Sequence, residues 1–517
     1  MFRKTLLPIF FLAIIFQATA QEIPVKYSVG ENYNDRYKYS NLLAIDDDGN
    51  GGSVLVRSYY TGIILKPKGY LIEHYNKDLE LISEYNYKLK GTRLVEGYVH
   101  NGQLYLLFLD YDYLGEAYKY TMHRSPLDAI NFAKETLLSI PTQPVRNPLD
   151  KNYYNRNFSS GFTTTVLLSD DKSAFAISTH FKKGKNNQHY IHLFSASLQK
   201  LVTQDFSSAA EEKNYAFENI EVSENLQNAY LIGKAYFKKK RFGALERKFQ
   251  YEMVAISKGG VKTQTFDDPG KFSEALKPTL HNNKLLCVGF YADRKDNRYN
   301  GLGYFELDPN TLAIKSKKYN PFSEQFMTDK FGKEYDKEVK NLVFKNLSFT
   351  SDNAILFNAE EYFVTSSMQS NSSGGRVRIN RYHHNDIVSA KLDANGDMVW
   401  ARNINKSEVT QGDGAYASYS SCTKGDNTYF FISSAAENPQ QLNNERIVFK
   451  QGLSRNRNVF VILLDKKGNM SYKKIIDDKE VRLPLMVSKP LMNETEDNML
   501  FYAKRGSKKQ LVQVIIN

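Results

Sequence analysis

One run of oxygen-bearing side chains has a spacing suited to a metal ion. In Asp46-Asp47-Asp48-Gly49-Asn50-Gly51, these side chains alternate at Asp46, Asp48 and Asn50, and Gly51 permits a sharp turn. Calcium takes about six to eight hard oxygen ligands, and this spacing matches the first half of a calcium loop. The twelfth position, where such a loop carries a bidentate acid, is Arg57. Two interpretations follow: a calcium site at Asp46, Asp48 and Asn50, or a plain hairpin turn rich in Asp, Asn and Gly.

A second candidate site is basic. Three arginines and two histidines follow one another in a segment rich in Ser, Asn and Gly: Arg376, Arg378, Arg381, His383 and His384. Guanidinium groups bind carboxylates and phosphates through paired hydrogen bonds, so this cluster is a candidate site for an anionic or glycan ligand. The plain alternative is a solvated surface loop.

Catalytic and cofactor-binding residues are not evident from local motifs. His180, His189 and His192 lie within one predicted hairpin. On a strand, however, His189 and His192 point to opposite faces and cannot chelate one ion without a bulge. The sequence contains no Gly-x-Ser-x-Gly and no Gly-rich phosphate-binding loop. We therefore assign no catalytic residue and no cofactor other than the candidate calcium.

The composition favours strands over helices. Aromatic residues make up 13% of the chain, with 35 Tyr and 32 Phe but a single Trp. Tyr, Phe, Val, Ile and Thr favour pleated, half-buried surfaces. We therefore expect an all-β protein.

Two kinds of turn alternate along the chain and indicate a repeat. The first kind is a polar Asn/Asp/Gly break before an apolar run, and it occurs eight times, near residues 46–52, 100–102, 169–172, 224–228, 282–283, 351–353, 425–427 and 493–498. The second kind is an apolar strand, an Asp-x-x-Gly-like turn and a returning strand, clearest at 459–472. Two hairpins form a four-stranded meander, and meanders in series indicate a β-propeller.

We expect eight four-stranded blades, with seven as the alternative. Strands such as Val459–Leu464 are apolar at every position, as a sheet packed between two neighbours requires. The eighth unit ends at 511–516 without a fourth strand, and the N-terminal segment 23–29 is predicted to supply it, closing the ring. Two or more separate β-sandwich domains are the competing interpretation.

One unit resembles a known family. The stretch from Ala390 to Trp400, with Asp393, Gly396 and Trp400, resembles the Asp…Gly…Trp repeat of the bacterial quinoprotein-like and WD40-like β-propellers. That family has one more residue between Asp and Gly and repeats the Trp in many blades, whereas Trp400 is the sole Trp here. The resemblance implies the fold and the docking of neighbouring blades, and it does not imply the quinone cofactor.

Three segments interrupt the repeat. The spacing of Phe322, Phe326, Tyr335 and Val339 predicts one or two short amphipathic helices. The segments 366–385 and 437–455 are rich in Ser, Asn, Gly and Gln, and we expect them to form long surface loops. Long loops on a rigid scaffold are common binding sites.

The first twenty residues predict export. Arg3 and Lys4 precede an apolar stretch from Leu6 to Phe16, and Ala18-Thr19-Ala20 forms a small-x-small cleavage site. We expect a signal peptide at 1–20 and a single propeller domain at 21–517, with no transmembrane segment. The chain has two cysteines, so a disulfide-rich ectodomain is disfavoured, and we predict the periplasm or cell surface of a Gram-negative bacterium. Cys287 lies in an apolar run and is predicted to be a core residue. The sequence does not decide whether it forms a disulfide with Cys422.

The net charge and the absence of nucleic-acid-binding motifs limit the classes of partner that we expect. The formal net charge is +12, yet no recognition helix, zinc finger or aromatic RNA-binding motif accompanies it, so nucleic acid is not expected as a partner. We expect a monomeric, non-catalytic binding scaffold of the cell envelope, whose partner is an envelope protein or a glycan. The alternative is a hydrolase or lyase that cleaves a polysaccharide or peptide at the propeller axis. The sequence alone leaves both classes open.

Overall fold

The computed structural model describes residues 23–63, 65–142, 144–145, 148–149, 162–183, 186–207, 213–237, 249–294, 298–332, 338–370, 375–412, 414–442, 446–452, 457–493 and 498–517. Within these ranges the chain is nearly all β, with one α-helix, α1 (Glu324–Phe331). None of its described helices is long and apolar enough to cross a membrane. The predicted signal peptide lies outside the described residues.

The first half of the chain forms four antiparallel sheets, which we number I to IV. Sheet I holds β3 (Tyr39–Asp47), β4 (Ser53–Thr61), β5 (Lys66–Tyr75) and β6 (Leu81–Tyr87). Sheet II holds β7 (Thr92–His100), β8 (Gln103–Asp112), β9 (Ala117–Pro126) and β10 (Ala133–Pro141). Sheet III holds β11 (Thr163–Leu168), β12 (Ala174–Lys183), β13 (Asn186–Ser195) and β14 (Lys200–Asp205). Sheet IV holds β15 (Lys213–Val222), β16 (Asn228–Phe237), β17 (Phe249–Ser257) and β18 (Gly260–Thr265).

The second half forms sheets V to VIII. Sheet V holds β19 (Phe272–His281), β20 (Lys284–Ala292), β22 (Gly301–Leu307) and β23 (Ile314–Pro321), and β21 (Arg298–Tyr299) pairs with β24 (Val339–Lys340) beside it. Sheet VI holds β25 (Leu342–Phe349), β26 (Ile355–Ser370), β27 (Arg376–Leu392), β28 (Met398–Thr410), β32 (Ile447–Lys450) and β31 (Gln440–Gln441). Sheet VII holds β29 (Tyr419–Lys424), β30 (Asn427–Ser434), β33 (Asn458–Leu464) and β34 (Met470–Ile476). Sheet VIII holds β35 (Leu491–Asn493), β36 (Asn498–Arg505), β37 (Lys508–Ile516), β1 (Val25–Val29) and β2 (Tyr33–Asn34).

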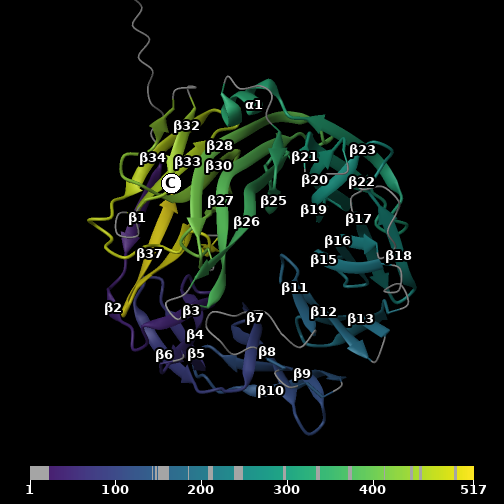
Figure 1. Ribbon diagram of the computed structural model, residues 1–517, viewed down its shortest axis with the longest axis vertical. Helices are drawn as coiled ribbons and strands as arrows, with labels where there is room; N and C mark the ends of the chain where they lie inside the picture. Colours follow the sequence, from purple (N-terminus) through teal and green to yellow (C-terminus); the bar gives the residue numbers. More distant parts are fainter. Residues whose placement is uncertain are drawn as a thin grey trace, which may run out of the picture.

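The sheets follow one another around a central opening, which is the arrangement of a β-propeller (Figure 1). In that view β11, β15 and β19 border the opening, whereas β10, β18 and β23 lie at the outer rim. The predicted propeller fold is thereby confirmed over the described residues. The number of blades stays a prediction, because segments between several sheets lie outside the described ranges.

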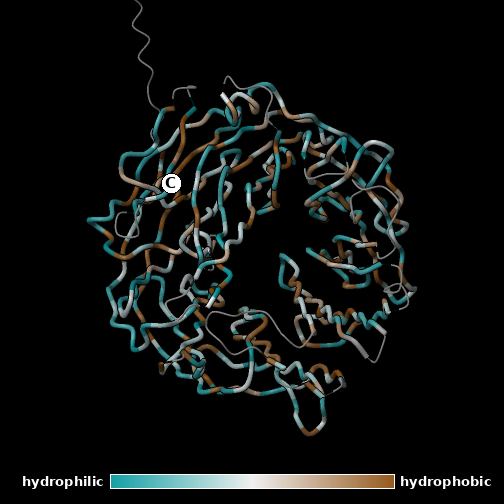
Figure 2. Tube along the Cα trace, in the orientation of Figure 1, coloured by the Kyte–Doolittle hydropathy of each residue, from teal (hydrophilic) through white to brown (hydrophobic). Residues whose placement is uncertain are grey.

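In the Asp-x-x-Gly turns, the side chain of the first residue, Asp, holds the turn by accepting backbone hydrogen bonds. Asp465 Oδ1 accepts hydrogen bonds from the backbone N–H groups of Lys467 and Asn469, both at 2.8 Å. Gly468 follows with φ of 79°, a conformation that favours glycine. This local chemistry closes the β33–β34 hairpin, and all seven residues of β33 are buried. Hydrophobic stretches accordingly run along the strands in Figure 2.

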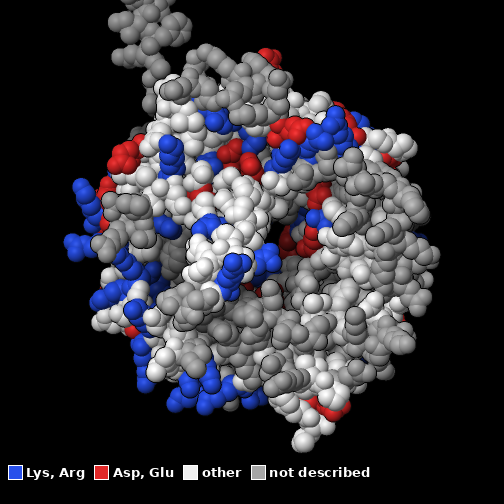
Figure 3. Space-filling view, in the orientation of Figure 1, with Lys and Arg blue, Asp and Glu red and all other residues white. Residues whose placement is uncertain are grey.

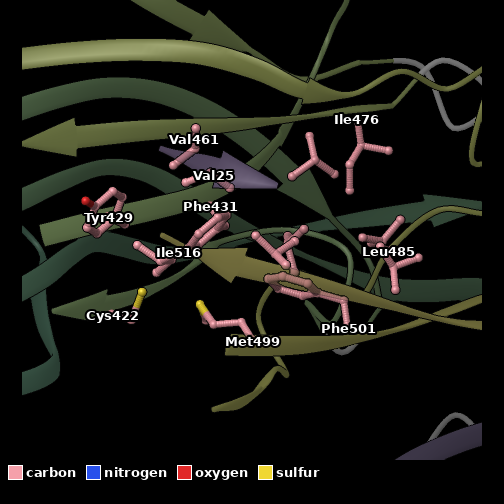
Figure 4. Close-up of a cluster of buried hydrophobic side chains, with 14 of the residues drawn as sticks. Val25, Cys422, Tyr429, Phe431, Val461, Ile476, Leu485, Met499, Phe501 and Ile516 are labelled. Carbon is pink, nitrogen blue, oxygen red and sulfur yellow. The ribbon is translucent and has the colours of Figure 1, made fainter. Parts of the chain in front are cut away.

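The N-terminal strand completes sheet VIII, as predicted. β1 pairs antiparallel with β37 from Val25↔Ile516 to Val29↔Val512. Ile23 and Val25 are buried in one cluster with residues of sheets VII and VIII, among them Phe431 and Phe501 (Figure 4). The two ends of the chain therefore share one sheet, and in Figure 1 the purple β1 lies among the yellow and green C-terminal strands.

Buried ion pairs join sheet VIII to sheet I where the ring closes. Arg57 on β4 is fully buried and binds both Asp35, at 2.6 Å, and Glu73 on β5. Lys509 on β37 reaches Glu73 at 2.6 Å, and Lys504 on β36 binds Asp35. Burial alone would raise the pKa of Glu73, but Arg57 and Lys509 outweigh burial and lower it. The closure thus combines an apolar core with a compensated charge network.

Trp400 docks sheet VI onto sheet VII, as the propeller resemblance implies. Its indole Nε1 donates a 3.0 Å hydrogen bond to the carbonyl oxygen of Lys466, in the β33–β34 turn. Its ring lies so close to Gly468 that a side chain at that position would collide with it. Gly396 packs in the same way against Tyr304 of sheet V. Turn glycines therefore act as docking surfaces between sheets.

The expected loop 366–385 proves to be a hairpin. Residues 366–370 and 376–385 belong to β26 and β27, because the hairpin continues far beyond the rest of sheet VI. The segment 437–455 contains two short strands, β31 and β32, and β32 pairs parallel with β28. The expectation for 366–385 was wrong because Ser, Asn and Arg, which are common in loops, here occupy exposed positions on strands. The helix expected in 322–339 is confirmed as α1, with Ser323 as its N-cap.

The two cysteines form no disulfide with each other in the structure. Cys287 is fully buried in a cluster between sheets IV and V, and its prediction as a core residue is confirmed. Cys422 is buried in a different cluster, with sheets VII and VIII. No bridge joins them.

Candidate functional site: the β26–β27 arm

The longest hairpin among the described residues projects from sheet VI. β26 and β27 pair from Ile355↔Leu392 out to Ser370↔Arg376. The neighbouring strands stop earlier, because β25 ends its pairing at Leu342↔Glu361 and β28 ends at Tyr382↔Thr410. Residues 363–370 and 376–381 therefore form a two-stranded ribbon, which we call the arm. In Figure 1 it crosses the near face of the ring toward the side that holds β3 and β7.

The cross-strand register divides the predicted basic site between two faces of the ribbon. Side chains alternate along a strand, so Arg376, Arg378 and His384 share one face. Arg381 and His383 lie on the other face, where the His383 ring stacks on Phe363 at 4.3 Å between centroids. The structure thus brings the five residues onto one hairpin, and not onto one surface.

Local hydrogen bonds hold the arm's basic side chains against its own strands. Arg378 donates to Ser366 Oγ at 3.1 Å, Arg381 donates to Ser367 Oγ at 2.9 Å, and His383 Nε2 lies 2.9 Å from Thr365 Oγ1. Large apolar side chains are exposed beside them: Val364, Met368 and Val377, with Met368 60% exposed. The arm therefore presents cationic and apolar groups together. Figure 3 shows basic side chains at this place, beside the central opening.

A buried charge cluster lies at the base of the arm. Lys406 on β28 is 2% exposed, and its Nζ contacts Glu360 Oε1 at 3.2 Å and Glu408 Oε2 at 2.9 Å. Nζ also donates to the carbonyl oxygen of His384 at 2.8 Å, which links β28 to β27. We call Glu360, His384, Lys406, Glu408 and Ser418 the anchor.

The pKa values of the two carboxylates in the anchor are shifted in opposite directions. Burial raises the pKa of Glu360, but Lys406, His384 and Lys345 outweigh burial and lower it from 4.5 to about 2. Burial raises the pKa of Glu408 despite the attraction of Lys406. Ser418 serves both acids, since its N–H donates to Glu408 at 2.7 Å and its hydroxyl to Glu360 at 2.8 Å.

His384 belongs to the anchor and not to an exposed ligand surface. Its Nδ1 lies 3.3 Å from Glu360 Oε2, and only 12% of its side chain is exposed. A carboxylate beside a histidine orients the ring. The candidate ligand residues that remain are Arg376, Arg378 and Arg381 on the arm and His383 next to it on β27.

Helix α1 also contacts the base of the arm. Lys330 on α1 is buried and forms 2.6 Å ion pairs with Glu361 on β26 and Asp386 on β27. Asp329 binds Arg402 on β28 at 2.5 Å. The arm therefore leaves the ring from a base that is cross-linked by charge on two sides.

The candidate calcium residues lie at the end of β3 and in the β3–β4 turn, where Asp46 and Asp48 form hydrogen bonds within the protein. Asp46 accepts from Val99 N–H at 2.6 Å and pairs with Lys172 at 2.5 Å. Asp48 Oδ1 accepts from the N–H groups of Asn50 and Gly52, both at 2.8 Å, and Oδ2 contacts His74 at 2.8 Å. Among the described residues, no group of three or more His, Cys, Asp or Glu side chains is arranged to hold a metal ion. The calcium assignment itself stays a prediction.

The three histidines of sheet III are split as strand geometry requires. His180 and His189 are cross-strand partners whose rings stack at 3.6 Å. His192 instead contacts Thr203 Oγ1 at 3.0 Å on the other face. His189 Nε2 lies 3.1 Å from Ser178 Oγ, but within the described residues its Nδ1 has no hydrogen-bond partner. Among the described residues, His189 therefore lacks the acid that orients a catalytic histidine.

Two acids on the inner strands β15 and β19 form ion pairs and hydrogen bonds within the protein. Glu274 on β19 pairs with Lys234 at 2.7 Å, and Glu218 on β15 accepts a hydrogen bond from Tyr251 at 2.6 Å. Lys234 also lies 3.4 Å from Glu218. Acidic and basic side chains are accordingly mixed around the central opening in Figure 3.

Sequence reasoning missed the anchor. Glu360 and the pair Lys406 and Glu408 have no common local motif, because Glu360 lies on β26 and the other two lie on β28, and they meet only in the folded sheet. One signal was present: Glu360 lies three residues after the apolar run Ala354–Phe357, in the buried first part of β26. A charge placed there must be compensated by a partner.

Comparison with known proteins finds only distant structural likenesses. No protein-family model and no curated protein sequence matches the chain. Similar solved structures include the β-propeller domain of the Trilobed protease from Pyrococcus furiosus (7% identity, 86% of this chain and 97% of that chain, TM-score 0.35). Sqt1 from Chaetomium thermophilum, bound to the N-terminus of ribosomal protein L10, gives 10% identity, 94% and 98% coverage and a TM-score of 0.39. Polysaccharide lyase Uly1 has 10% sequence identity, and the match covers 93% of this chain and 90% of that chain with a TM-score of 0.36. Likenesses this distant carry no argument about function.

Proposed function

We propose that this protein is an exported, non-catalytic binding scaffold of the bacterial cell envelope, and that the arm is its binding element. The observation that carries the proposal is a projecting hairpin with exposed cationic and apolar side chains on a base cross-linked by buried charges. The predicted signal peptide at 1–20 supports export. The resemblance to the quinoprotein-like and WD40-like propellers stays a prediction about the family.

The chemistry of the arm indicates an acidic protein partner. Its described residues include Arg376, Arg378 and Arg381, and no acid. Beyond the pairing limits of β25 and β28, the outer edge of each arm strand has no neighbouring strand among the described residues. An extended segment of a partner can add to such an edge through main-chain hydrogen bonds. Acidic side chains on that segment would complement the three arginines.

The base of the arm favours binding over chemistry. An isolated two-stranded ribbon is marginally stable in water, so a ribbon held in a fixed direction needs support at its base. The anchor and Lys330 supply that support. Rigid presentation lowers the entropy that is lost when a partner binds.

Site-specific photo-crosslinking in the native envelope tests the proposal. A photoreactive residue at Met368, which is 60% exposed, is compared with one at Ile82 on β6, which is 55% exposed. We expect one defined protein to crosslink at Met368 and not at Ile82. That protein, purified, should bind the scaffold with an affinity that falls as salt is raised.

Two variants establish that the arm carries the interaction. Thr365 and Arg381 are cross-strand partners, so residues 366–380 can be replaced by Asn-Gly, which favours a tight hairpin turn. We expect this variant to keep its unfolding temperature and to lose the partner. R376E/R378E should weaken binding at low salt, whereas the matched surface change R482E/R505E should not. Retention of the partner by the shortened arm, or equal crosslinking at Ile82, would refute the proposal.

A further inference from the structure

A polar cavity opens between sheets III and IV, away from the arm. Its volume is about 370 Å³, at the lower end of the ~300–1,000 Å³ range of ligand pockets. It lies at the end of the apolar cluster in which Ile191, Tyr215 and Phe217 pack the two sheets together. The lining residues are Thr163, Thr165, Ser178, His180, Phe181, Asn187, Gln188, Asn214, Tyr215, Ala216 and Phe217.

The lining combines three kinds of group. Amides come from Asn187, Gln188 and Asn214, and hydroxyls come from Thr163, Thr165 and Ser178. Aromatic rings form the third kind, and those of Tyr215 and Phe217 are parallel, with centroids 5.2 Å apart. Every amide can both donate and accept, as can every hydroxyl. Such a set is matched to a ligand that carries several neighbouring hydroxyl groups and one apolar face.

The cavity wall is rigid. The Tyr215 hydroxyl donates to the buried Glu252 at 2.7 Å, which fixes the ring. His180 stacks on His189, and His189 Nε2 lies 3.1 Å from Ser178 Oγ. A preformed wall of this kind limits the entropy lost on binding.

The cavity carries no formal charge on its described lining residues at neutral pH. Its described lining includes no Asp, Glu, Lys or Arg. His180 is the one titratable base there, and burial lowers its pKa. Glu252, which accepts the hydrogen bond from Tyr215, is itself compensated by Lys213 at 2.7 Å. A charged ligand would therefore enter without a counter-charge, which disfavours it.

We propose that this cavity binds an uncharged sugar ring, either as a free sugar or as the end of a glycan. Hydroxyls of the sugar would pair with the amide and hydroxyl side chains, and the apolar face of its ring would lie on an aromatic side chain. The site is distinct from the arm and independent of the proposed protein partner.

Calorimetric titration of the purified full chain tests this assignment. The ligands are glucose, galactose, mannose and N-acetylglucosamine, each with a matching oligosaccharide, together with charged glucosamine and glucuronate and a capped neutral dipeptide. We expect at least one neutral sugar to bind with one site per chain. A tighter oligosaccharide would indicate a glycan end, and equal affinities would indicate a free sugar.

Matched variants localise the binding. T165V and N214A each remove one neutral hydrogen bond and should weaken binding about two- to tenfold. T263V, at an exposed threonine on β18, is the control and should leave binding unchanged. A216L adds bulk to the cavity without cutting into the core and should abolish binding. Unchanged unfolding temperatures verify that each variant is folded.

Three results would overturn the inference. The first is no binding by any neutral sugar at millimolar concentration. The second is binding that T165V, N214A and A216L leave unchanged. The third is a charged sugar or the dipeptide that binds more tightly than every neutral sugar.

Discussion

Removing the lysine of the anchor should destabilise the protein strongly at neutral pH. The change K406M keeps the aliphatic stem and deletes the one amine that contacts both Glu360 and Glu408. Breaking a buried ion pair by removing one partner costs about 3–5 kcal/mol, because the remaining charge is left uncompensated. For 517 residues, an unfolding entropy of about 2.1 cal/mol/K per residue amounts to roughly 1.1 kcal/mol/K. The loss therefore corresponds to about 3–5 °C in unfolding temperature.

The pH dependence identifies the cause of the loss. In the native protein the pKa of Glu360 is lowered from 4.5 to about 2, so its stabilising effect is present above 4.5 and is lost as the pH falls toward 2. Glu408, whose pKa is raised by burial, has the opposite sign, and its contribution is lost as the pH rises. Without Lys406, burial should raise both pKa values, so both acids should take up protons at mildly acidic pH. The K406M deficit should therefore be smaller at pH 4 than at pH 7.

Calorimetric or circular-dichroism melts at the two pH values provide the measurement. The control is K284M, which removes an ion pair to Glu306 whose lysine is 50% exposed. Exposed pairs contribute about 0–1 kcal/mol, so the control should melt within about 1 °C of the native protein. A K406M deficit no larger than that of K284M, or one that is equal at pH 4 and pH 7, would refute the reasoning.

Three further predictions concern the scaffold. A Cβ added at Gly233 would collide with the backbone of Ala216, so G233A should lower the free energy of unfolding by about 1–3 kcal/mol in urea titrations, whereas G259A, whose nearest contact is 3.6 Å away, should not. R57M leaves Asp35 and Glu73 without their shared guanidinium at the ring closure; the expected loss is about 3–5 kcal/mol, and a melt like that of the native protein would contradict it. Because Asp48 already accepts three internal hydrogen bonds, calcium and chelator should give the same thermal midpoint, and a calcium-dependent rise would instead establish the candidate metal site.

Much of the scaffold could be predicted from the sequence because it depends on neighbouring residues. Strands with uninterrupted apolar residues must be covered on both faces, and turns that begin with Asp465 or Asp393 form hydrogen bonds within a few residues. The N-terminal strand could be placed because the last unit lacked a strand and an open sheet edge is unfavourable. Trp400 could be assigned to inter-sheet docking from one repeat.

The binding features were decided by tertiary structure alone. Composition could not show that the stretch around Arg376–Arg381 is a ribbon, because polar residues are equally suited to a loop and to an exposed strand. The two faces of the arm follow from the alternation of side chains along a strand, and they could be assigned only once the stretch was known to be a strand. The anchor joins Glu360, His384 and Lys406 from three strands, and the cavity joins Thr165 of sheet III with Asn214 of sheet IV. Such groups meet only in the folded sheets, since each lies far from its partners along the chain.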